Sequence, residues 1–418
     1  MSRTTTSAAI DARYYNSFAY AGGYLPKDRA RAHATLKELT ERATEWKGDH
    51  IPPVADLETL LQTDPVVLQY VSDMIEQVPE DERTVSDIPH LLQCLDHIAT
   101  TTPVYHWDPA LRQFFPLSHL FVYMMATDGG WNAFRNKLFN DKLDGILQYW
   151  YGVLSGKESR VVLNDGPTGW LSPPAYQEFR LFEFDVKDEE YGGFASYNDF
   201  FHRALDPDFP YRPLASDPKA IVSPNDGKVV RWRSDVKRTD QFWLKGQPYS
   251  LENMLNGSTY TDKFVGGDVL QTFLSGADYH RWHAPVDGKV VAVEKVSGYT
   301  FAELQSTLPD PTAGTHSQCY GASVNTRGIV IIESTAPKIG HVCVLPVGIT
   351  EISSITHCVK VGDTVTKGQD IGRFSFGGSS MCLLFERGAV DRLAPDNPSS
   401  DPDNGAPVFV NGQIARAR

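Results

Sequence analysis

Hydrophobic residues follow two different periods in two parts of the chain. Between about residues 30 and 155 they recur every three to four positions, which is typical of amphipathic helices. After about residue 216, short Val- and Ile-rich segments alternate with Gly, Pro and Asp-Gly turns, which is typical of strands. The two patterns predict an α+β protein, with a helical N-terminal region followed by a β-rich domain. We expect an N-terminal arm (1–29), a helical domain (30–155), a mixed connecting segment (156–215) and the β-rich domain (216–418).

Capping residues and hydrophobic stripes predict three helices. Asp64-Pro65 predicts an N-cap followed by proline at the first helical position. The hydrophobic face of that helix would be Val67, Val71, Met74, Ile75 and Val78. A second helix is predicted from about Trp131 to Leu154, and its hydrophobic stripe would be Phe139, Leu143, Ile146, Trp150 and Leu154. Ser196 and Asp199 predict an N-cap pair that opens a short third helix.

Turn motifs organise the β-rich region. Segments 224–230 and 285–291 are similar, and each reads as a tight turn that feeds a strand. Segment 359–369 resembles the turn of lipoyl and biotinyl carrier domains, although the Met-Lys-Met hairpin of such carriers is absent. The polar, proline-rich stretch 394–405 predicts an exposed loop, and a last strand is predicted over 406–410.

Composition excludes several classes of partner. The 418 residues carry a net charge of -13 and no polybasic cluster, which argues against binding to nucleic acid or to an anionic membrane surface. No stretch approaches the roughly 20 apolar residues of a membrane span, so no stable membrane insertion is expected. The start of the chain lacks the apolar core of a signal peptide. The five cysteines are scattered without a Cys-x-x-Cys pair, so a reduced, cytoplasmic protein is predicted.

Three short elements contain candidate chemistry. Taken singly, Asp226-Gly227 is typical of a hairpin turn, and Gly378-Ser379 is typical of a plain turn. His280 and His283 have a spacing that could bind a metal, but no further ligand cluster lies nearby in sequence, so no metal site is predicted. Together they supply an acid, a histidine and a serine.

A nucleophilic serine needs a general base within hydrogen-bond reach, and the base needs an orienting carboxylate. Asp226, His283 and Ser379 could fill these roles, but no Gly-x-Ser-x-Gly elbow supports a conventional serine hydrolase. Gly378 places no side chain beside its carbonyl, so the Ser379 hydroxyl can approach it, and Gly377 permits a strained turn. This pattern suggests a chain that cuts its own backbone.

Four segments together resemble the phosphatidylserine decarboxylase family. They are 196–201, 223–227, 278–285 and 372–380, and they occur in that family's order within about residues 190–418. The resemblance implies a phosphatidylserine-decarboxylase-like catalytic domain that depends on a pyruvoyl group and needs no pyridoxal phosphate. The precursor would be a zymogen that cleaves itself between residues 378 and 379.

The resemblance also assigns roles to individual residues. His283, oriented by Asp226, would act as the general base for self-cleavage, and Ser379 would become the covalent pyruvoyl group, supported by Gly377 and Ser380. The products would be a β chain, 1–378, and an α chain, 379–418, held together noncovalently. The pyruvoyl carbonyl would form a Schiff base with the substrate amine. His280 resembles the histidine that serves decarboxylation or reprotonation.

The substrate is indicated by departures from the usual family pattern. Segments 347–355 and 376–380 differ from those of members that act on phospholipid and are similar to a soluble fungal branch that decarboxylates free aromatic L-amino acids, tryptophan among them. The alternatives are a phosphatidylserine decarboxylase that makes phosphatidylethanolamine and an uncleaved, non-catalytic scaffold. An oligomer remains open.

Three residues are candidates for the substrate pocket: Ile349, Glu351 and Phe376. Glu351 could meet the substrate amine, and Ile349 could reshape the pocket. The alternative is that Ile349 belongs to a strand core and Glu351 lies on the surface.

Overall fold

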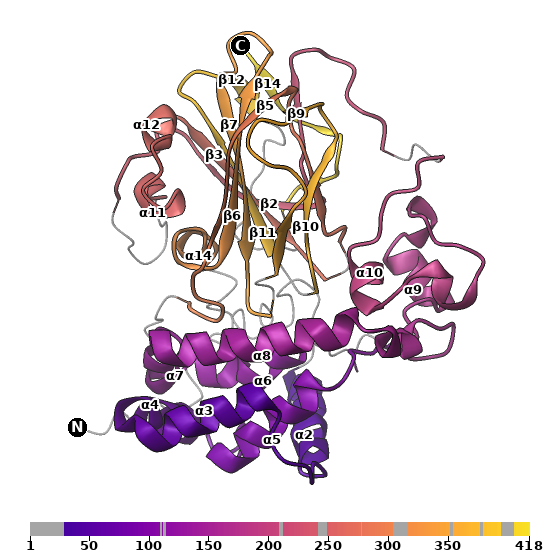
Figure 1. Cartoon of the computed structure of the whole chain (residues 1–418), viewed down its shortest axis with the longest axis vertical. Coiled ribbons are helices and arrows are strands. Elements are labelled where there is room, and N and C mark those ends of the chain that lie inside the picture. The colour runs from indigo at the N-terminus through magenta and orange to yellow at the C-terminus, as the bar shows by residue number, and fades with distance from the viewer. Residues whose placement is uncertain are drawn as a thin grey trace.

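The computed structural model has the expected α+β architecture, with a helical region beneath a β-rich domain (Figure 1). The structure describes residues 29–108, 111, 114–208, 212–240, 249–276, 278–303, 317–351, 354–376, 379–393 and 405–418. The N-terminal arm up to residue 28, Gly377, Gly378 and most of the predicted 394–405 loop lie outside the described residues.

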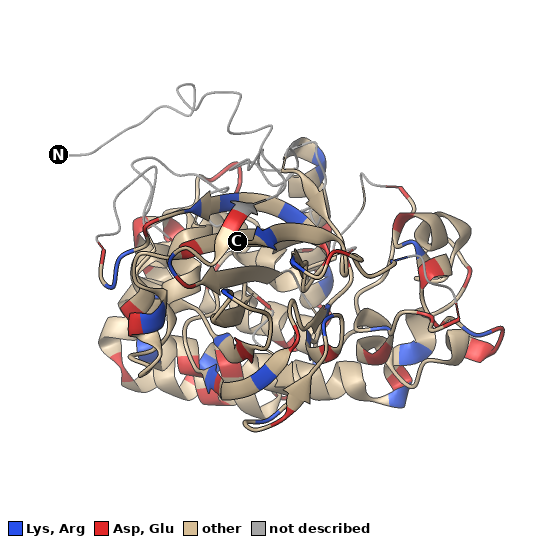
Figure 2. Cartoon of the chain, turned by 90° about the horizontal axis from the view of Figure 1, so that it is seen from above, with Lys and Arg blue, Asp and Glu red and all other residues tan. Residues whose placement is uncertain are grey.

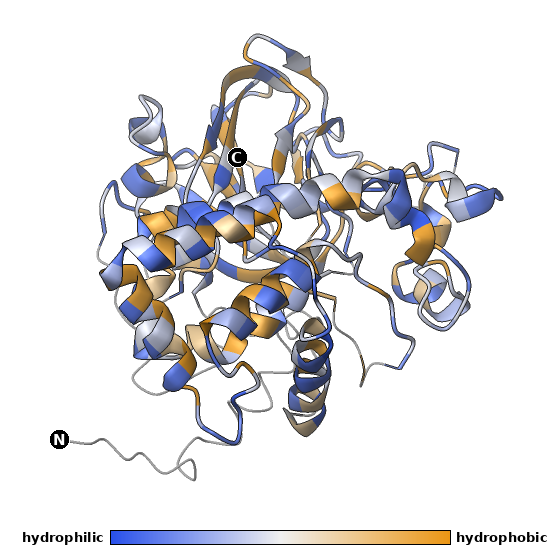
Figure 3. Ribbon diagram, turned by 60° about the horizontal axis from the view of Figure 1, so that its bottom comes forward, coloured by the Kyte–Doolittle hydropathy of each residue, from blue (hydrophilic) through white to orange (hydrophobic). Residues whose placement is uncertain are grey.

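The helical region lies across one end of the strands (Figure 1). Its helices are α2 (Arg29–Ala43), α3 (Pro52–Thr63), α4 (Pro65–Glu76), α5 (Ile88–Ala99), α6 (Pro116–Met125), α7 (Asp128–Ala133) and α8 (Lys137–Ser155). Helix α8 runs directly below the strand ends, and hydrophobic and hydrophilic residues interleave along it, as an amphipathic helix requires (Figure 3).

The two predicted helix caps are confirmed, and the start of the helix predicted from its hydrophobic stripe is corrected. The Asp64 side chain accepts hydrogen bonds from the amides of Val66 and Val67, so α4 begins at Pro65 as expected. The helix expected from Trp131 is instead two helices, because the Asn136 side chain caps a new start at Lys137. The hydrophobic stripe predicted for α8 is buried throughout.

The connecting segment contains short helices that pack beside α8. They are η3 (Lys157–Val162), α9 (Pro173–Glu178), η4 (Leu181–Glu183), η5 (Glu190–Gly193) and α10 (Tyr197–Phe201). Ser196 caps α10 by accepting from the Asp199 amide, and the Asp199 carboxylate accepts from the Ala195 amide, which confirms the predicted pair.

Three antiparallel sheets form the β-rich domain. The large sheet has the order β13-β2-β3-β11-β7-β6-β5-β9, and the small sheets have the orders β1-β14-β12 and β4-β10-β8. The strands up to β7 are β1 (Ala220–Val222), β2 (Gly227–Arg233), β3 (Asp268–Leu274), β4 (Arg281–His283), β5 (Gly288–Val296), β6 (Arg327–Ser334) and β7 (His341–Gly348). The others are β8 (Ile355–His357), β9 (Thr364–Val365), β10 (Asp370–Phe374), β11 (Ser379–Phe385), β12 (Val390–Leu393), β13 (Pro407–Val408) and β14 (Gln413–Ala417). Short helices α11 (Leu251–Met254), α12 (Thr261–Phe264) and α14 (Gln318–Val324) cover one face.

Strand β11 lies inside the large sheet and is buried along its whole length. It pairs with β3 on one side and with β7 on the other. Because side chains alternate along a strand, Met381 and Leu383 enter the core shared with the β4-β10-β8 sheet, whereas Cys382 and Leu384 enter the core beneath α14. Its continuous apolar run therefore reflects burial on both faces.

Two strand predictions need correction. The C-terminal strand pattern predicted over 406–410 forms only the two-residue strand β13, and the last strand is β14. Asp226-Gly227 is not a hairpin turn between paired neighbours, because β1 pairs with β14 while β2 pairs with β3 and β13. The predicted strands after residues 227 and 288 are confirmed as β2 and β5.

Charged residues of both signs are distributed over the helices and the strands (Figure 2). Among the described residues, no helix is long and apolar enough to cross a membrane.

Ile414 tests the contribution of β14 to stability. It is 2% exposed and packs in the core between the sheets, so Ile414→Ala should lower the free energy of unfolding by about 2–5 kcal/mol. Its exposed neighbour Gln413 provides the control, and Gln413→Ala should change it by less than about 0.5 kcal/mol. Urea unfolding would be compared in a Ser379→Ala background, so that one uncut chain is measured. Equal effects of the two substitutions would contradict this placement of β14.

Candidate active site

Ser379 is the first residue of β11 and is fully buried. It lies opposite Leu274 of β3 and Gly348 of β7. Its hydroxyl oxygen has no hydrogen-bond partner among the residues that the structure describes. Buried hydroxyls are normally satisfied, so an unpaired one at the start of an inner strand makes Ser379 a candidate for a chemical role.

The next residue, Ser380, is held by a buried network. Its hydroxyl donates to the Thr272 carbonyl at 2.9 Å and accepts from Gln271 Nε2 at 2.8 Å. Gln271 Nε2 also donates to the Gln318 carbonyl at 3.0 Å, and Gln271 Oε1 accepts from the Tyr249 hydroxyl at 2.7 Å. The start of β11 is therefore fixed by side chains as well as by its strand ladder.

His283 lies at the end of β4, with both ring nitrogens in hydrogen bonds. Its Nδ1 is 2.7 Å from the Gly368 carbonyl, which can only accept, so Nδ1 carries the proton. Nε2 is therefore the basic nitrogen, and it accepts from the Tyr279 hydroxyl at 2.8 Å. Burial lowers the pKa of His283 and favours the neutral ring that a general base requires.

The Asp226 carboxylate contacts groups other than His283. It accepts from the Val410 amide at 2.9 Å and pairs with Arg212, whose guanidinium also binds Glu183 at 2.6 Å. Burial raises the pKa of Asp226 to about 6 and outweighs the opposite effect of Arg212. Among the described residues, the Asp226 carboxylate therefore makes no hydrogen bond to the His283 imidazole that it was expected to orient.

A path between Asp226 and His283 runs through two side chains that the sequence did not single out. The Arg212 guanidinium lies 5.5 Å from the centre of the Tyr279 ring, and the Tyr279 hydroxyl contacts His283. Tyr279 is four residues before His283 in the same motif, which is the one sequence signal that could have identified it. Arg212 and Glu183 lie outside every motif.

His280 is buried against an aromatic ring. Its imidazole stacks on Phe201 of α10, with ring centres 4.0 Å apart and an interplanar angle of 28°. The Phe374 amide donates to the His280 carbonyl at 2.9 Å, which joins the histidine segment to β10. His280 therefore faces the connecting segment, close to the end of β10 that leads towards Ser379.

Phe376, three residues before Ser379, is enclosed by aromatic side chains. Their ring centres lie 5.2–5.5 Å away and belong to Phe115, Trp150, Tyr197 and Phe201. The Phe376 amide donates to Asn198 Oδ1 at 3.3 Å. Residues from the helical region and the connecting segment thus fix the chain just before the predicted cleavage point.

Glu351 is buried and binds the first turn of α6. Its carboxylate accepts from the Ser118 amide at 2.6 Å and from the Ser118 hydroxyl. Burial raises the pKa of Glu351, although the Ser118 hydrogen bonds act in the opposite direction. The alternative that Glu351 lies on the surface is wrong, and its two oxygens are engaged by α6.

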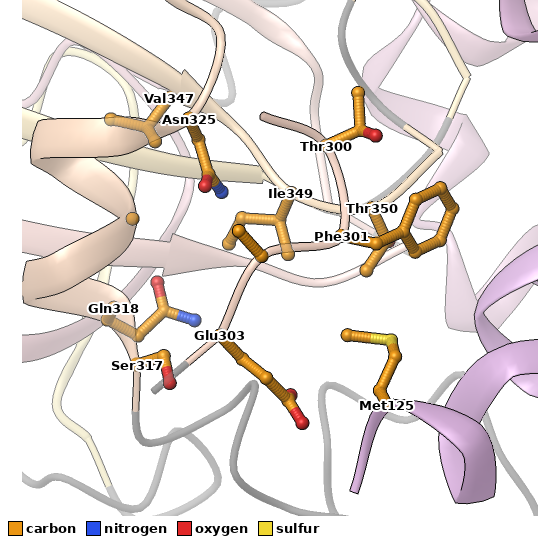
Figure 4. Close-up of a pocket in the computed structure, with 12 residues that line it drawn as sticks. Met125, Thr300, Phe301, Glu303, Ser317, Gln318, Asn325, Val347, Ile349 and Thr350 are labelled. Carbon is orange, nitrogen blue, oxygen red and sulfur yellow. The ribbon is translucent and has the colours of Figure 1, made fainter. Parts of the chain in front are cut away.

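A pocket with an empty volume of about 350 Å³, part of it open to solvent, lies at the end of β7. It is lined by Met125, Thr300, Phe301, Ala302, Glu303, Ser317, Gln318, Gly321, Asn325, Val347, Ile349 and Thr350 (Figure 4). Val347 and Ile349 flank Gly348, the residue opposite Ser379. Ile349 follows the end of β7, so the alternative that it belongs to a strand core is wrong.

The structure thus places the candidate residues in two groups. Phe376 and His280 both pack against the Phe201 ring, whereas His283 is hydrogen-bonded to Tyr279 and Asp226 pairs with Arg212. No hydrogen bond between Ser379 and His283 is present among the described residues. Within the same described ranges, no group of three or more His, Cys, Asp or Glu residues is arranged to hold a metal.

Comparison with known proteins identifies the class. A sequence profile described as phosphatidylserine decarboxylase matches residues 197–408, and a second profile for the same enzyme matches residues 51–179. The decarboxylase iboD of Amanita muscaria is 38% identical over 65% of this chain and 83% of its own length. The L-tryptophan decarboxylase of Psilocybe cubensis is 31% identical over 86% of this chain and 87% of its own length. A phosphatidylserine decarboxylase proenzyme of Fusobacterium nucleatum is 30% identical over 59% of this chain and 75% of its own length.

The fold, the buried serine and these matches define a decarboxylase, which is a carboxy-lyase. The chain belongs to the phosphatidylserine decarboxylase family.

Asp226 predicts a pH dependence of stability. Its folded pKa of about 6 exceeds the ordinary value of 3.8, so its contribution to stability is fully present below pH 3.8 and is lost as the pH rises through 6. The melting temperature of the Ser379→Ala protein relative to its Asp226→Asn variant should therefore fall between pH 4 and pH 7.

Asp217 is the matched control, because this exposed carboxyl has a lowered pKa. Replacing Asp217 with Asn should give a pH slope of the opposite sign. A relative stability of the Asp226 protein that increases with pH would contradict the prediction.

Proposed function

We propose that this chain is a pyruvoyl-dependent decarboxylase that cleaves itself between Gly378 and Ser379 and then decarboxylates a free aromatic L-amino acid, with tryptophan favoured. The observation that carries the proposal is the buried Ser379 hydroxyl, unpaired among the described residues, at the first position of a central strand. The family membership supports the same chemistry.

The surroundings of Ser379 fit its conversion to a pyruvoyl group. The converted residue would stay in the sheet, because Ser380 is held by Thr272 and Gln271. The Ser379 hydroxyl makes no hydrogen bond to a described residue, so its conversion would break none of these contacts. A ketone carbonyl there would supply an electron sink for the electron pair released as carbon dioxide leaves the substrate.

Self-cleavage needs a base for the Ser379 hydroxyl. His283 Nε2 takes that proton, and the serine oxygen attacks the Gly378 carbonyl, so the peptide bond becomes an ester. Elimination then releases the Gly378 carboxylate and leaves a dehydroalanine, and addition of water releases ammonia. The Gly368 carbonyl keeps the proton on Nδ1. The Tyr279 hydroxyl donates a hydrogen bond to Nε2 before the proton transfer.

After cleavage, the two chains would remain joined by the sheet. Strand β11 of the α chain pairs along its whole length with β3 and β7 of the β chain. Strand β14 pairs with β1, and the Val410 amide binds Asp226. These contacts support a noncovalent pair whose site contains residues of both chains.

His280 would act in the decarboxylation step, in which a proton must be returned to the substrate carbon. Its ring is buried against Phe201, and Phe376 and its aromatic neighbours lie beside it. Such surroundings exclude bulk water and favour loss of a carboxylate over its retention as a solvated ion.

The extent of the matches supports a free amino acid as the substrate. The two L-tryptophan decarboxylases align with 86% and 89% of this chain, including the helical region. The phosphatidylserine decarboxylase proenzymes align with 50–59% of it. Helix α6 carries Met125 into the pocket wall, so the helical region shapes the pocket at the end of β7.

Intact-mass measurement of the purified protein tests the self-cleavage. The wild type should yield a fragment of 40 of the 418 residues, about one tenth of the 46.5 kDa chain, with a blocked N-terminus. Ser379→Ala should remain one chain. A single uncut wild-type chain would favour the scaffold alternative. If the chain is cut, the release of amine from tryptophan or from phosphatidylserine would identify the substrate.

Substitution of His283 and of His280 should affect different reactions, self-cleavage and decarboxylation. His283→Ala should slow self-cleavage at least a hundredfold, whereas His280→Ala should be cut but lose decarboxylation to a similar extent. Because burial lowers the pKa of His283, the wild-type cleavage rate should stay level as the pH falls through 6.5. His341→Ala, at the far end of β7, should leave both reactions unchanged. Identical defects in the first two variants would count against the assigned roles.

A further inference from the structure

Two buried amide side chains line the pocket with unused hydrogen-bond acceptors. Asn325 is 4% exposed and Gln318 is 9% exposed. Asn325 Oδ1 and Gln318 Oε1 accept no hydrogen bond from any residue that the structure describes. Figure 4 shows both amides near Ile349, with Met125 on the opposite side. Unpaired buried acceptors destabilise a fold, so a pair of them in one pocket points to a ligand that donates.

The orientation of the Asn325 amide is fixed by the backbone. Its Nδ2 donates to the Gly348 carbonyl at 2.9 Å, so Oδ1 is the acceptor that remains. Gln318 and Asn325 stand at the two ends of α14, and Gly321 lies between them in the pocket wall. A Cβ atom at Gly321 would come within 3.2 Å of Asn325 Nδ2, so glycine keeps this wall open.

Both amides are connected to the start of the predicted α chain. Gly348, which Asn325 binds, lies opposite Ser379 in the sheet. Paired residues of antiparallel strands have Cα atoms about 5 Å apart. The Gln318 carbonyl shares Gln271 with the Ser380 hydroxyl. A substrate attached at residue 379, the first residue of β11, would extend past the end of β7, where Ile349 and Thr350 line the same pocket as the two acceptors.

The rest of the pocket wall is apolar apart from Thr300, Glu303, Ser317 and Thr350. Phe301, Val347 and Ile349 face the same space as the two amides, with Met125 at the side of α6. Apolar walls favour a hydrophobic ring, and the buried acceptors favour a donor on that ring. A negatively charged side chain would be repelled by the two carbonyl oxygens.

We propose that Asn325 Oδ1 and Gln318 Oε1 accept a hydrogen bond from an N–H or O–H group on the substrate's side chain, so that the site selects aromatic amino acids whose ring carries a donor. This selection rests on the proposed function, because it concerns the substrate of the same site. An indole ring has the required combination, a large apolar body with one N–H donor. A substrate without the donor leaves the acceptors desolvated and unpaired, which is the strongest form of discrimination available to a polar site.

An isosteric pair of amino acids tests the proposal. L-Tryptophan and L-3-(3-benzothienyl)alanine have nearly the same shape, but sulfur replaces the indole N–H in the second. Binding of each to the uncut Ser379→Ala protein would be measured by titration calorimetry, and kcat/KM would be measured for the processed wild type. We expect tryptophan to bind at least tenfold more tightly and to be preferred by at least the same factor in kcat/KM.

Gln318→Met removes one acceptor with little change in volume and leaves the backbone contact with Gln271 intact. It should reduce the preference for tryptophan at least threefold, whereas the exposed Gln177→Met should leave the preference unchanged.

Equal binding of the two compounds, or binding of neither, would overturn the proposal about the acceptors. An uncut wild-type chain in the mass measurement would overturn the pyruvoyl mechanism instead, so the two failures are distinguishable.

Discussion

The position of Ser379 at the beginning of a doubly paired central strand is the constraint on which the rest of the site depends. Both neighbours of β11 hold its backbone, and Gln271 and Thr272 hold the next side chain. A residue so restricted has one position relative to the pocket and to the chain before it. Reaction at a fixed geometry avoids the entropy of bringing groups together, which is the advantage that this position would give to the proposed self-cleavage.

The helical region is part of this site and not an appendage. Glu351 binds the first turn of α6, and the same helix ends at Met125 in the pocket wall. Phe115 and Trp150 enclose Phe376 from the same region. Close-packed interiors have little free space. A shift of α6 or α8 would therefore be transmitted through this aromatic cluster to the chain before Ser379.

His283 is contacted by a turn that lies outside its own sequence motif. The turn that resembles a carrier domain contributes the Gly368 carbonyl, which sets the tautomer of the ring. Gly368 has a φ of +83°, and a Cβ there would lie 2.7 Å from the Asn411 side chain, so a glycine is needed at this point. Asp226 pairs with Arg212 and accepts from the Val410 amide, and the Arg212 guanidinium lies 5.5 Å from the centre of the Tyr279 ring.

The sequence by itself determined what depends on local order: the α+β class, the Asp64 and Ser196 helix starts, and the segment that contains Ser379. These follow from side-chain periodicity and capping, which involve residues a few positions apart. Only the tertiary structure decided the contacts of His283 with Gly368 and of Glu351 with Ser118, since these join residues 85 and 233 positions apart. Spacing along a chain carries no information about such pairs. Packing and the need to satisfy buried polar groups select them once the sheets and helices have assembled.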